Sequence, residues 1–126
     1  MGLEKELKNL NLRIGVDVVV VKRMELLYQK WGEKGWKRFL TSRELEQCFK
    51  PESVAGIFAV KEAFSKAVGS GIGRELSFHQ LEVLKNQSGK PILKIDPEIR
   101  EKFQISQVDI SISHDGGIAV GIVVLG

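Results

Sequence analysis

The chain of 126 residues contains one cysteine, two histidines and three prolines. A single cysteine, Cys48, excludes an internal disulfide framework, and His79 and His114 are too few to complete a Cys/His zinc site with it. A domain of this length buries roughly two-thirds of its unfolded surface and needs neither kind of cross-link. We therefore expect one domain, residues 1–126, with one hydrophobic core in a reducing compartment.

Long hydrophobic runs are also missing. No apolar run approaches the roughly 20 residues that cross a bilayer. The segment between Met1 and Leu12 has no apolar stretch of the kind that signal peptides contain. These absences argue against a membrane protein and predict a cytoplasmic one.

Charge of one sign is only slightly in excess. The sequence has 19 basic and 16 acidic residues, a formal net charge of +3, and 7% aromatic residues. Proteins that bind nucleic acid usually carry a basic stripe interleaved with aromatic side chains, whereas the basic residues here are scattered. We therefore expect no nucleic-acid partner. The small positive excess is compatible with a phosphorylated cofactor or an acidic protein.

The hydrophobic pattern predicts strands near both ends of the chain and helices between them. Residues 12–21 are nearly all apolar and predict a strand buried on both faces, with Asp17 as the one charge inside it. Leu3, Leu7 and Leu10 have helical spacing. Helices are expected over 22–31, 36–40, 41–49 and 52–68 and from 96 to 103, and strands over 77–85, 92–95, 108–113 and 118–125. This order predicts an α+β fold in which a mostly antiparallel sheet packs against a long central helix.

Local signals fix several ends of these elements. Thr41 and Glu44 form a capping-box pattern at the start of a helix. Pro51 suits the first turn of the longest helix. The glycine run 69–73 supplies the positive φ that ends helices. This run could also cradle phosphate, but phosphate-binding loops follow a strand and open a helix, so we favour the helix stop.

Three charged side chains point to chemistry. Asp17 would be costly to bury alone, so it is either satisfied by a salt bridge or backbone groups, or a ligand for a hard cation such as Mg²⁺. Glu62 and Lys66 lie four residues apart and share a helix face. They form either a solvated salt bridge or a carboxylate for metal beside an ammonium for phosphate. The second arrangement suits reactions of a pyrophosphate.

Other candidate residues are individually weak. Residues 111–115 end a strand in hydroxyl groups and an imidazole, which suits either an ordinary hairpin or hydrogen bonds to phosphate oxygens. Residues 89–91 form an ordinary hairpin connection unless a ligand lies beside them. His79 is expected on the surface of a strand, and Cys48 in packing or at the surface with no base beside it.

Together and in this order, the motifs resemble the holo-acyl-carrier-protein synthase family, the small 4′-phosphopantetheinyl transferases. The resemblance spans residues 13–124. Its motifs are Gly15-Val16-Asp17 with Arg23, Phe39-Leu40-Thr41 with Glu44, Ala55-Gly56, the block 58–67, Gly69-Ser70-Gly71, Gly89-Lys90-Pro91 and the block 111–114. The chain departs from the family at Ile57, where an arginine is common.

The resemblance implies an enzyme of fatty acid biosynthesis. Such an enzyme transfers the 4′-phosphopantetheine group of coenzyme A to a serine of an acyl carrier protein, with Mg²⁺, and releases adenosine 3′,5′-bisphosphate. By position, Asp17 and Glu62 resemble the metal ligands and Lys66 the lysine that binds the pyrophosphate, and these three are the expected catalytic residues. Arg23 is expected to dock the acidic carrier protein. The proton acceptor stays open between Glu62 and a water.

The resemblance also implies contacts to the nucleotide and an assembly. The residues expected to bind coenzyme A are Lys61, Lys66, Gly69, Gly71, Gly89, Lys90, Pro91, Ser113 and His114. Lys61 is one residue that could replace the charge missing at Ile57. Small members of the family form homotrimers with sites between subunits, and the apolar segment 118–125 fits either that interface or a core strand.

The alternative function is a module that binds coenzyme A or a nucleotide without transferring a group. The pair Asp17 and Glu62 argues against it, because a pure binding module needs no two ligands for a hard cation beside a lysine.

Overall fold

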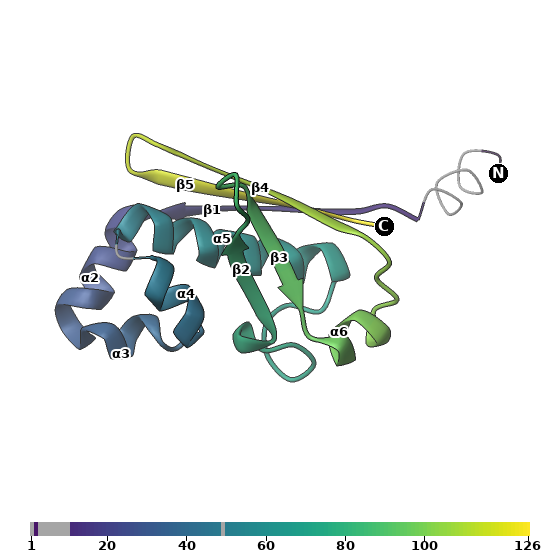
Figure 1. The fold of residues 1–126 in the computed structure, drawn as a ribbon, viewed down its shortest axis with the longest axis horizontal. Helices are drawn as coiled ribbons and strands as arrows, with labels where there is room; N and C mark the ends of the chain where they lie inside the picture. The colour runs from purple at the N-terminus through teal and green to yellow at the C-terminus, as the bar shows by residue number, and fades with distance from the viewer. Residues whose placement is uncertain (1, 3–10, 49) are drawn as a thin grey trace.

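The computed structural model describes residues 2, 11–48 and 50–126 (Figure 1). The helical spacing predicted from Leu3, Leu7 and Leu10 lies outside these residues. None of the helices in the described part combines the length and apolar composition needed to span a bilayer. The elements follow in the order β1 (Arg13–Val20), α2 (Val21–Trp31), α3 (Glu33–Trp36), α4 (Ser42–Gln47), α5 (Pro51–Val68), η1 (Phe78–Gln80), β2 (Leu81–Lys85), β3 (Pro91–Ile95), α6 (Pro97–Lys102), β4 (Val108–Asp115) and β5 (Ile118–Leu125).

The strands form two antiparallel sheets. One has the order β1-β5-β4, and the other is the hairpin β2-β3, which runs steeply across the direction of the first (Figure 1). Asp17 of β1 lies opposite Gly121 of β5, and Lys85 of β2 lies opposite Pro91 of β3. The antiparallel pairing confirms the predicted α+β class, with the difference that the strands are divided between two sheets.

The long helix α5 packs against one face of the three-stranded sheet, and two glycines allow a close approach. A Cβ atom on Gly15 would overlap the backbone carbonyl of Ala63, and one on Gly121 would lie 2.5 Å from the backbone nitrogen of Val60. Side chains alternate along a strand, so Asp17 points to the same face as Gly15. The glycines therefore let the Asp17 carboxylate meet the C-terminal half of α5.

Both ends of α5 follow the local signals. Pro51 occupies the first turn, where its missing N–H costs no helical hydrogen bond. Gly69 ends the helix in the left-handed conformation at φ +83°, and its N–H donates to the carbonyl oxygen of Ser65 at 2.9 Å. This geometry confirms that Gly69 stops the helix.

The prediction that the first strand is buried on both faces is wrong. Val19 is 2% exposed, but Ile14 is 71% exposed and Val18 is 59% exposed. Helix α5 covers one side of the sheet, and no described element packs on the other. The exposed apolar residues of this uncovered side, which we call the outer face, are Ile14, Val16, Val18, Val20, Ile118, Ile122 and Val124.

Two capping boxes fix shorter elements. The Thr41 hydroxyl accepts from the Glu44 N–H at 3.2 Å, and the Thr41 N–H donates to Glu44 Oε1 at 2.8 Å, which confirms the predicted box. A second box, between Ser77 and Gln80, was not predicted. It folds residues 78–80 into a 3₁₀ turn, so the strand begins at Leu81 instead of 77.

His79 accordingly lies in this 3₁₀ turn and not on a strand. Its Nε2 atom lies 2.8 Å from the backbone oxygen of Lys37. The contact attaches the turn to the segment that follows α3.

Candidate functional site

An acid from β1 and a lysine from α5 form an ion pair at the junction of the two elements. Lys66 Nζ donates to Asp17 Oδ1 at 2.8 Å and lies 3.3 Å from the carbonyl oxygen of Val16. The Asp17 side chain is 17% exposed and that of Lys66 is 56% exposed. Lys66 therefore pairs with Asp17, although its helical spacing also suited a pair with Glu62. The ammonium group stays accessible to a ligand.

Glu62 lies one helical turn before Lys66 and is electrostatically coupled to the same pair. Burial raises the pKa of Glu62, and the Asp17 carboxylate raises it further, while Lys66 and Arg23 oppose the shift. The two carboxylates thus interact across the 45 residues that separate them in the sequence. Their mutual repulsion leaves excess negative charge, which a divalent cation would neutralise.

The donor set at this junction fits Mg²⁺ better than a transition metal. Among the described residues, no three His, Cys, Asp or Glu side chains gather in a group that could hold an ion. Mg²⁺ keeps most of its waters and is commonly held by one or two carboxylates plus phosphate oxygens of a substrate. Asp17 and Glu62 could supply those carboxylates.

The Lys66 side chain can act as a cation and not as a base. Its hydrogen bond with Asp17 raises the pKa of Lys66, with a further contribution from the charge of Asp17. The ammonium therefore stays protonated at neutral pH. A fixed positive charge beside two carboxylates suits the binding of a phosphate group.

A groove of about 540 Å³ opens beside Glu62, and we call it the basic groove. Its lining includes Arg23, Lys30, Trp31, Arg38, Phe58 and Glu62. The Arg23 guanidinium carbon lies 4.8 Å from the centre of the Phe58 ring. Lys30 Nζ and the Arg38 guanidinium carbon lie 5.4 and 5.5 Å from the centre of a ring of Trp31, which is 49% exposed. The sequence pointed to Arg23 but not to Lys30 or Arg38. Arg38 lies 15 residues after Arg23, and only the fold brings the two side chains to the same groove.

Lys61 is not available to a ligand, contrary to the expectation that it contacts the nucleotide. Its side chain is 0% exposed, and Nζ donates to Glu44 Oε1 at 2.7 Å and to the Phe39 carbonyl at 2.6 Å. Burial lowers the pKa of Lys61, and the Glu44 carboxylate opposes that shift. Glu44 also accepts from the backbone N–H of Val83 at 2.7 Å. The pair therefore joins α4, α5 and β2 inside the molecule.

Two of the residues expected at the nucleotide line one cavity of about 190 Å³, which we call the hairpin cavity. They are Pro91 of β3 and His114 of β4, and Ile57 of α5 and Ile112 of β4 lie in the same lining. The structure therefore places Ile57, the departure from the family pattern, beside the residues that the resemblance assigned to the nucleotide.

The remaining expected contacts are distributed elsewhere. Ser113 lies between Ile112 and His114 on β4. Because side chains alternate along a strand, Ser113 points to one side of the sheet and the other two point to the opposite side. Lys90 Nζ forms an ion pair with Asp109 Oδ1 at 3.0 Å. Gly89 lies in the hairpin turn, where its N–H donates to the carbonyl oxygen of Asn86 at 3.0 Å.

Gly69 and Gly71 follow α5 with positive φ values of 83° and 69°. Neither glycine lines the hairpin cavity. The conformation of Gly69 is accounted for by the helix stop.

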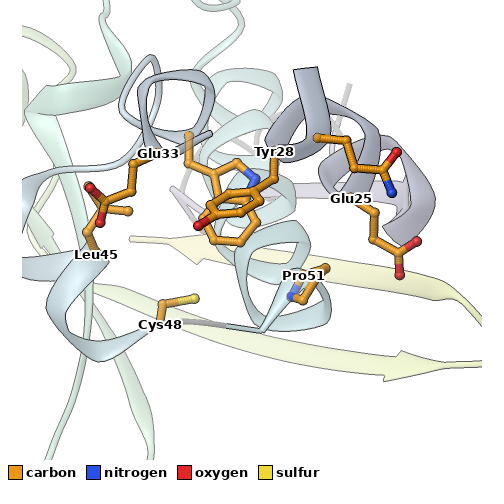
Figure 2. Close-up of a pocket in the computed structure, with 8 residues that line it drawn as sticks. Glu25, Tyr28, Glu33, Leu45, Cys48 and Pro51 are labelled. Carbon is orange, nitrogen blue, oxygen red and sulfur yellow. The ribbon is translucent and has the colours of Figure 1, made fainter. Parts of the chain in front are cut away.

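A further cavity, of about 430 Å³, lies between α2, α3, α4 and the start of α5 (Figure 2). The tilted rings of Tyr28 and Trp36 have their centres 4.6 Å apart, and Glu25, Glu33 and Cys48 also line the cavity. None of the residues predicted to act in catalysis or binding lines this cavity. It belongs to the packing of the short helices.

Cys48 is expected to react about 100-fold more slowly with iodoacetamide at pH 8 in the folded protein than in guanidinium chloride. Burial raises its pKa from the ordinary value of 9.0 to about 11, with a smaller contribution from Glu44. Two pKa units correspond to about 100-fold less thiolate, the form that attacks. Mass spectrometry of timed samples measures the rate. Equal rates in both states would show that the thiol is not protected as the structure describes.

The raised thiol pKa also makes the fold sensitive to alkaline pH. Its contribution to stability is complete below pH 9 and is lost as the pH rises from 9 toward 11, because the unfolded chain ionises first.

Comparison with known proteins identifies one family over nearly the whole chain. The model of the 4′-phosphopantetheinyl transferase superfamily matches residues 13–123. A protein of Nautilia profundicola named holo-[acyl-carrier-protein] synthase is 46% identical over 112 residues, which make up 89% of this chain and 97% of that protein. The protein of the same name from Wolinella succinogenes is 42% identical over 89% of this chain and 95% of its own.

Solved structures agree with these relatives. The holo-[acyl-carrier-protein] synthase of Helicobacter pylori in complex with coenzyme A superimposes with a TM-score of 0.87 at 39% identity, over 90% of this chain and 99% of that chain. The Bacillus anthracis structure, described as a complex with coenzyme A (3′,5′-ADP), gives a TM-score of 0.74 at 40% identity, over 90% and 94% of the two chains.

Proposed function

The chain belongs to the 4′-phosphopantetheinyl transferase superfamily, and from this premise we propose that it is a holo-acyl-carrier-protein synthase. Its reaction transfers the 4′-phosphopantetheine group of coenzyme A to a serine of apo acyl carrier protein. The observation that carries the proposal is the cluster of Asp17, Glu62 and Lys66, where two coupled carboxylates lie beside an accessible ammonium group.

The bonds in this reaction define what the site must do. The serine oxygen forms a bond to the phosphorus that bears the pantetheine chain. The bond from that phosphorus to the bridging oxygen of the pyrophosphate breaks, and adenosine 3′,5′-bisphosphate leaves with that oxygen. The serine proton is released. Such a transfer between polyanions depends on in-line placement and on neutralisation of charge more than on covalent help.

Asp17 and Glu62 would hold Mg²⁺ in this proposal. The fit rests on the coupling of the two carboxylates, since the charge of Asp17 disfavours ionisation of Glu62 without a cation. When bound, Mg²⁺ supplies charge neutralisation at the pyrophosphate. Glu62 lies on α5 and Asp17 on β1, so the close packing at Gly15 keeps the two carboxylates together.

Lys66 would bind the pyrophosphate. Its side chain is 56% exposed and bonded to Asp17, so it can turn from the carboxylate to a phosphate oxygen without a change in the backbone. The hydrogen bond with Asp17 keeps the ammonium charged and oriented before the substrate arrives. A cation kept charged beside the substrate in this way stabilises negative charge in the transition state.

The basic groove would receive the carrier protein. It combines the charges of Arg23, Lys30 and Arg38 with the exposed ring of Trp31, and Glu62 lies in its lining. A strongly acidic partner matches this combination of positive charge and apolar surface. The groove would bring the serine of the carrier beside the carboxylates.

Arg23→Ala is expected to raise the KM for apo acyl carrier protein about 10-fold and to leave the dissociation constant for coenzyme A nearly unchanged. The loss corresponds to one hydrogen bond to a charged group. Steady-state kinetics at several carrier concentrations and calorimetry with coenzyme A measure the two effects. Arg74→Ala, which removes an exposed arginine outside the groove, is the matched control. An equal loss of carrier use and coenzyme A binding would remove Arg23 from the docking surface.

The outer face favours a homotrimer, the assembly that the family resemblance implies. Four side chains of β1 and three of β5 expose apolar surface on one side of a single sheet. Contiguous apolar surface of this kind usually marks an interaction site. A second and third copy of the chain would cover it and would bury Ser113, which points to the same side. Light scattering gives the mass in solution and tests the proposal.

The decisive test of the function is incubation with coenzyme A, Mg²⁺ and apo acyl carrier protein, followed by mass spectrometry of the carrier. The proposal expects a mass gain of one phosphopantetheine group per carrier and none when Mg²⁺ is chelated. An unchanged carrier, together with tight binding of coenzyme A, would favour the alternative of a non-catalytic binding module. A role in fatty acid biosynthesis, a cytoplasmic location and a single transferase domain over 1–126 are further parts of the proposal.

A further inference from the structure

The hairpin cavity contains a cation that the sequence motifs do not include. Ile57, Val83 and Ile112 give it an apolar lining, and His114 lies at the same cavity. The additional cation is Lys85, the last residue of β2. No Asp or Glu among the described residues lines the cavity. An apolar surface with an imidazole and an ammonium suits a neutral planar ring with an anionic group close to it.

The register of the hairpin directs Lys85 into this cavity. Lys85 and Pro91 are direct cross-strand partners, so their side chains leave the hairpin on the same face. Val83, two residues before Lys85, points to that face as well. The hairpin therefore contributes three residues of the same face to the cavity: Val83, Lys85 and Pro91.

Two other lysines that were expected to bind the nucleotide are engaged elsewhere. Lys61 is enclosed with Glu44, and Lys90 is paired with Asp109 at 3.0 Å and lines a different cavity. Among the described residues, Lys85 forms no ion pair, and it is exposed. Cys48 is another lining residue, and the charge of Lys85 partly opposes the rise in the pKa of its thiol, which agrees with an ammonium close to the cavity.

We infer that Lys85 binds the 3′-phosphate of coenzyme A and supplies the positive charge absent at Ile57. The inference rests on the proposed function, because it takes coenzyme A as the ligand. The adenine ring would lie on the apolar lining, and the phosphate would lie between Lys85 and His114. Lys85 is then a binding residue at the nucleotide end of the substrate, and it takes no part in breaking the pyrophosphate.

The test compares coenzyme A with 3′-dephospho-coenzyme A, which differs only by this phosphate. For Lys85→Ala, the dissociation constant of coenzyme A is expected to rise about 10-fold, as for the loss of a hydrogen bond to a charged group. That of the dephosphorylated ligand is expected to stay unchanged. Lys85→Arg keeps the charge and should retain most of the affinity. Lys94→Ala is the control, because Lys94 is also exposed but lies on the opposite face of the same hairpin.

The possible outcomes separate this inference from the proposed function. Equal weakening of both ligands in Lys85→Ala would place the lysine at the pyrophosphate or in the fold and would overturn the inference. Unchanged affinity for coenzyme A would overturn it as well. If the unsubstituted chain neither binds coenzyme A nor modifies the carrier protein, the proposed function itself fails.

Discussion

Glu62→Gln is expected to lower the rate of phosphopantetheine transfer about 1000-fold, comparable to the loss of a group that stabilises transition-state charge. Glutamine has nearly the same size but no negative charge, so it cannot neutralise a divalent cation together with Asp17. The assay is transfer to apo acyl carrier protein at saturating Mg²⁺. Asp17→Asn is expected to have an effect of similar size, because the same ion would lose its other carboxylate.

The fold should survive Glu62→Gln and should even gain stability when no metal is bound. The pKa of Glu62 is raised by burial and by Asp17, so the ionised carboxylate destabilises the folded state above that pKa. An amide removes this repulsion. In EDTA at neutral pH, the Tm of the variant is therefore expected to equal or exceed that of the unsubstituted chain. Mg²⁺ is expected to raise the Tm only of the unsubstituted chain.

A control variant separates this effect from a general loss of negative charge. Glu101→Gln removes one carboxylate from the exposed side of α6, away from β1 and α5, and should leave transfer unchanged. Near-normal turnover of Glu62→Gln at saturating Mg²⁺ would remove Glu62 from the proposed metal site. A low rate combined with a low Tm would instead indicate damage to the fold.

Features that depend on a few neighbouring residues could be predicted from the sequence. The capping box of Thr41 and Glu44 and the helix stop at Gly69 follow from side-chain and backbone chemistry within one turn. The missed box at Ser77 and Gln80 is local too, but the apolar pattern after it favoured a longer strand.

Features that depend on how the helices and sheets pack against one another could not be predicted from local sequence. Three of the four valines of the first strand, Val16, Val18 and Val20, lie on one face, and the sequence does not say that this face is left uncovered within the chain. Ser113 and His114 point to opposite sides of the sheet because β4 continues to Asp115, whereas the predicted strand ended at 113. Family motifs place residues near a ligand without telling which side of a sheet they occupy.

Lys61 is the clearest case of a motif residue whose role is set by distant partners. It stands beside Glu62 in the block that carries the family resemblance, yet its contacts are Glu44, which is 17 residues away, and the Phe39 carbonyl. These partners give the buried lysine an opposite charge and a carbonyl acceptor. The sequence shows that Lys61 is a lysine, but only the fold shows that the Glu44 carboxylate lies against it.

Lys61→Met is expected to lower the free energy of unfolding by about 3–5 kcal/mol, the usual cost of leaving one partner of a buried ion pair alone. Methionine fills much of the same space, but it leaves the Glu44 carboxylate at 0% exposure with no opposite charge. A loss of this size is a large part of the roughly 5–15 kcal/mol that stabilises a typical domain. Urea unfolding followed by circular dichroism measures it.

Lys66→Met is the matched control on the same helix, because Lys66 also pairs with a carboxylate at nearly the same distance, 2.8 Å against 2.7 Å. Its side chain is 56% exposed, so the loss of this pair is expected to lower the free energy of unfolding much less than the loss of the Lys61 pair does. The expected difference in stability between the two variants thus comes from the burial of the ion pair and not from its length. If Lys61→Met keeps its stability but binds coenzyme A more weakly, Lys61 contacts the ligand after all, and the enclosed pair does not represent the working protein.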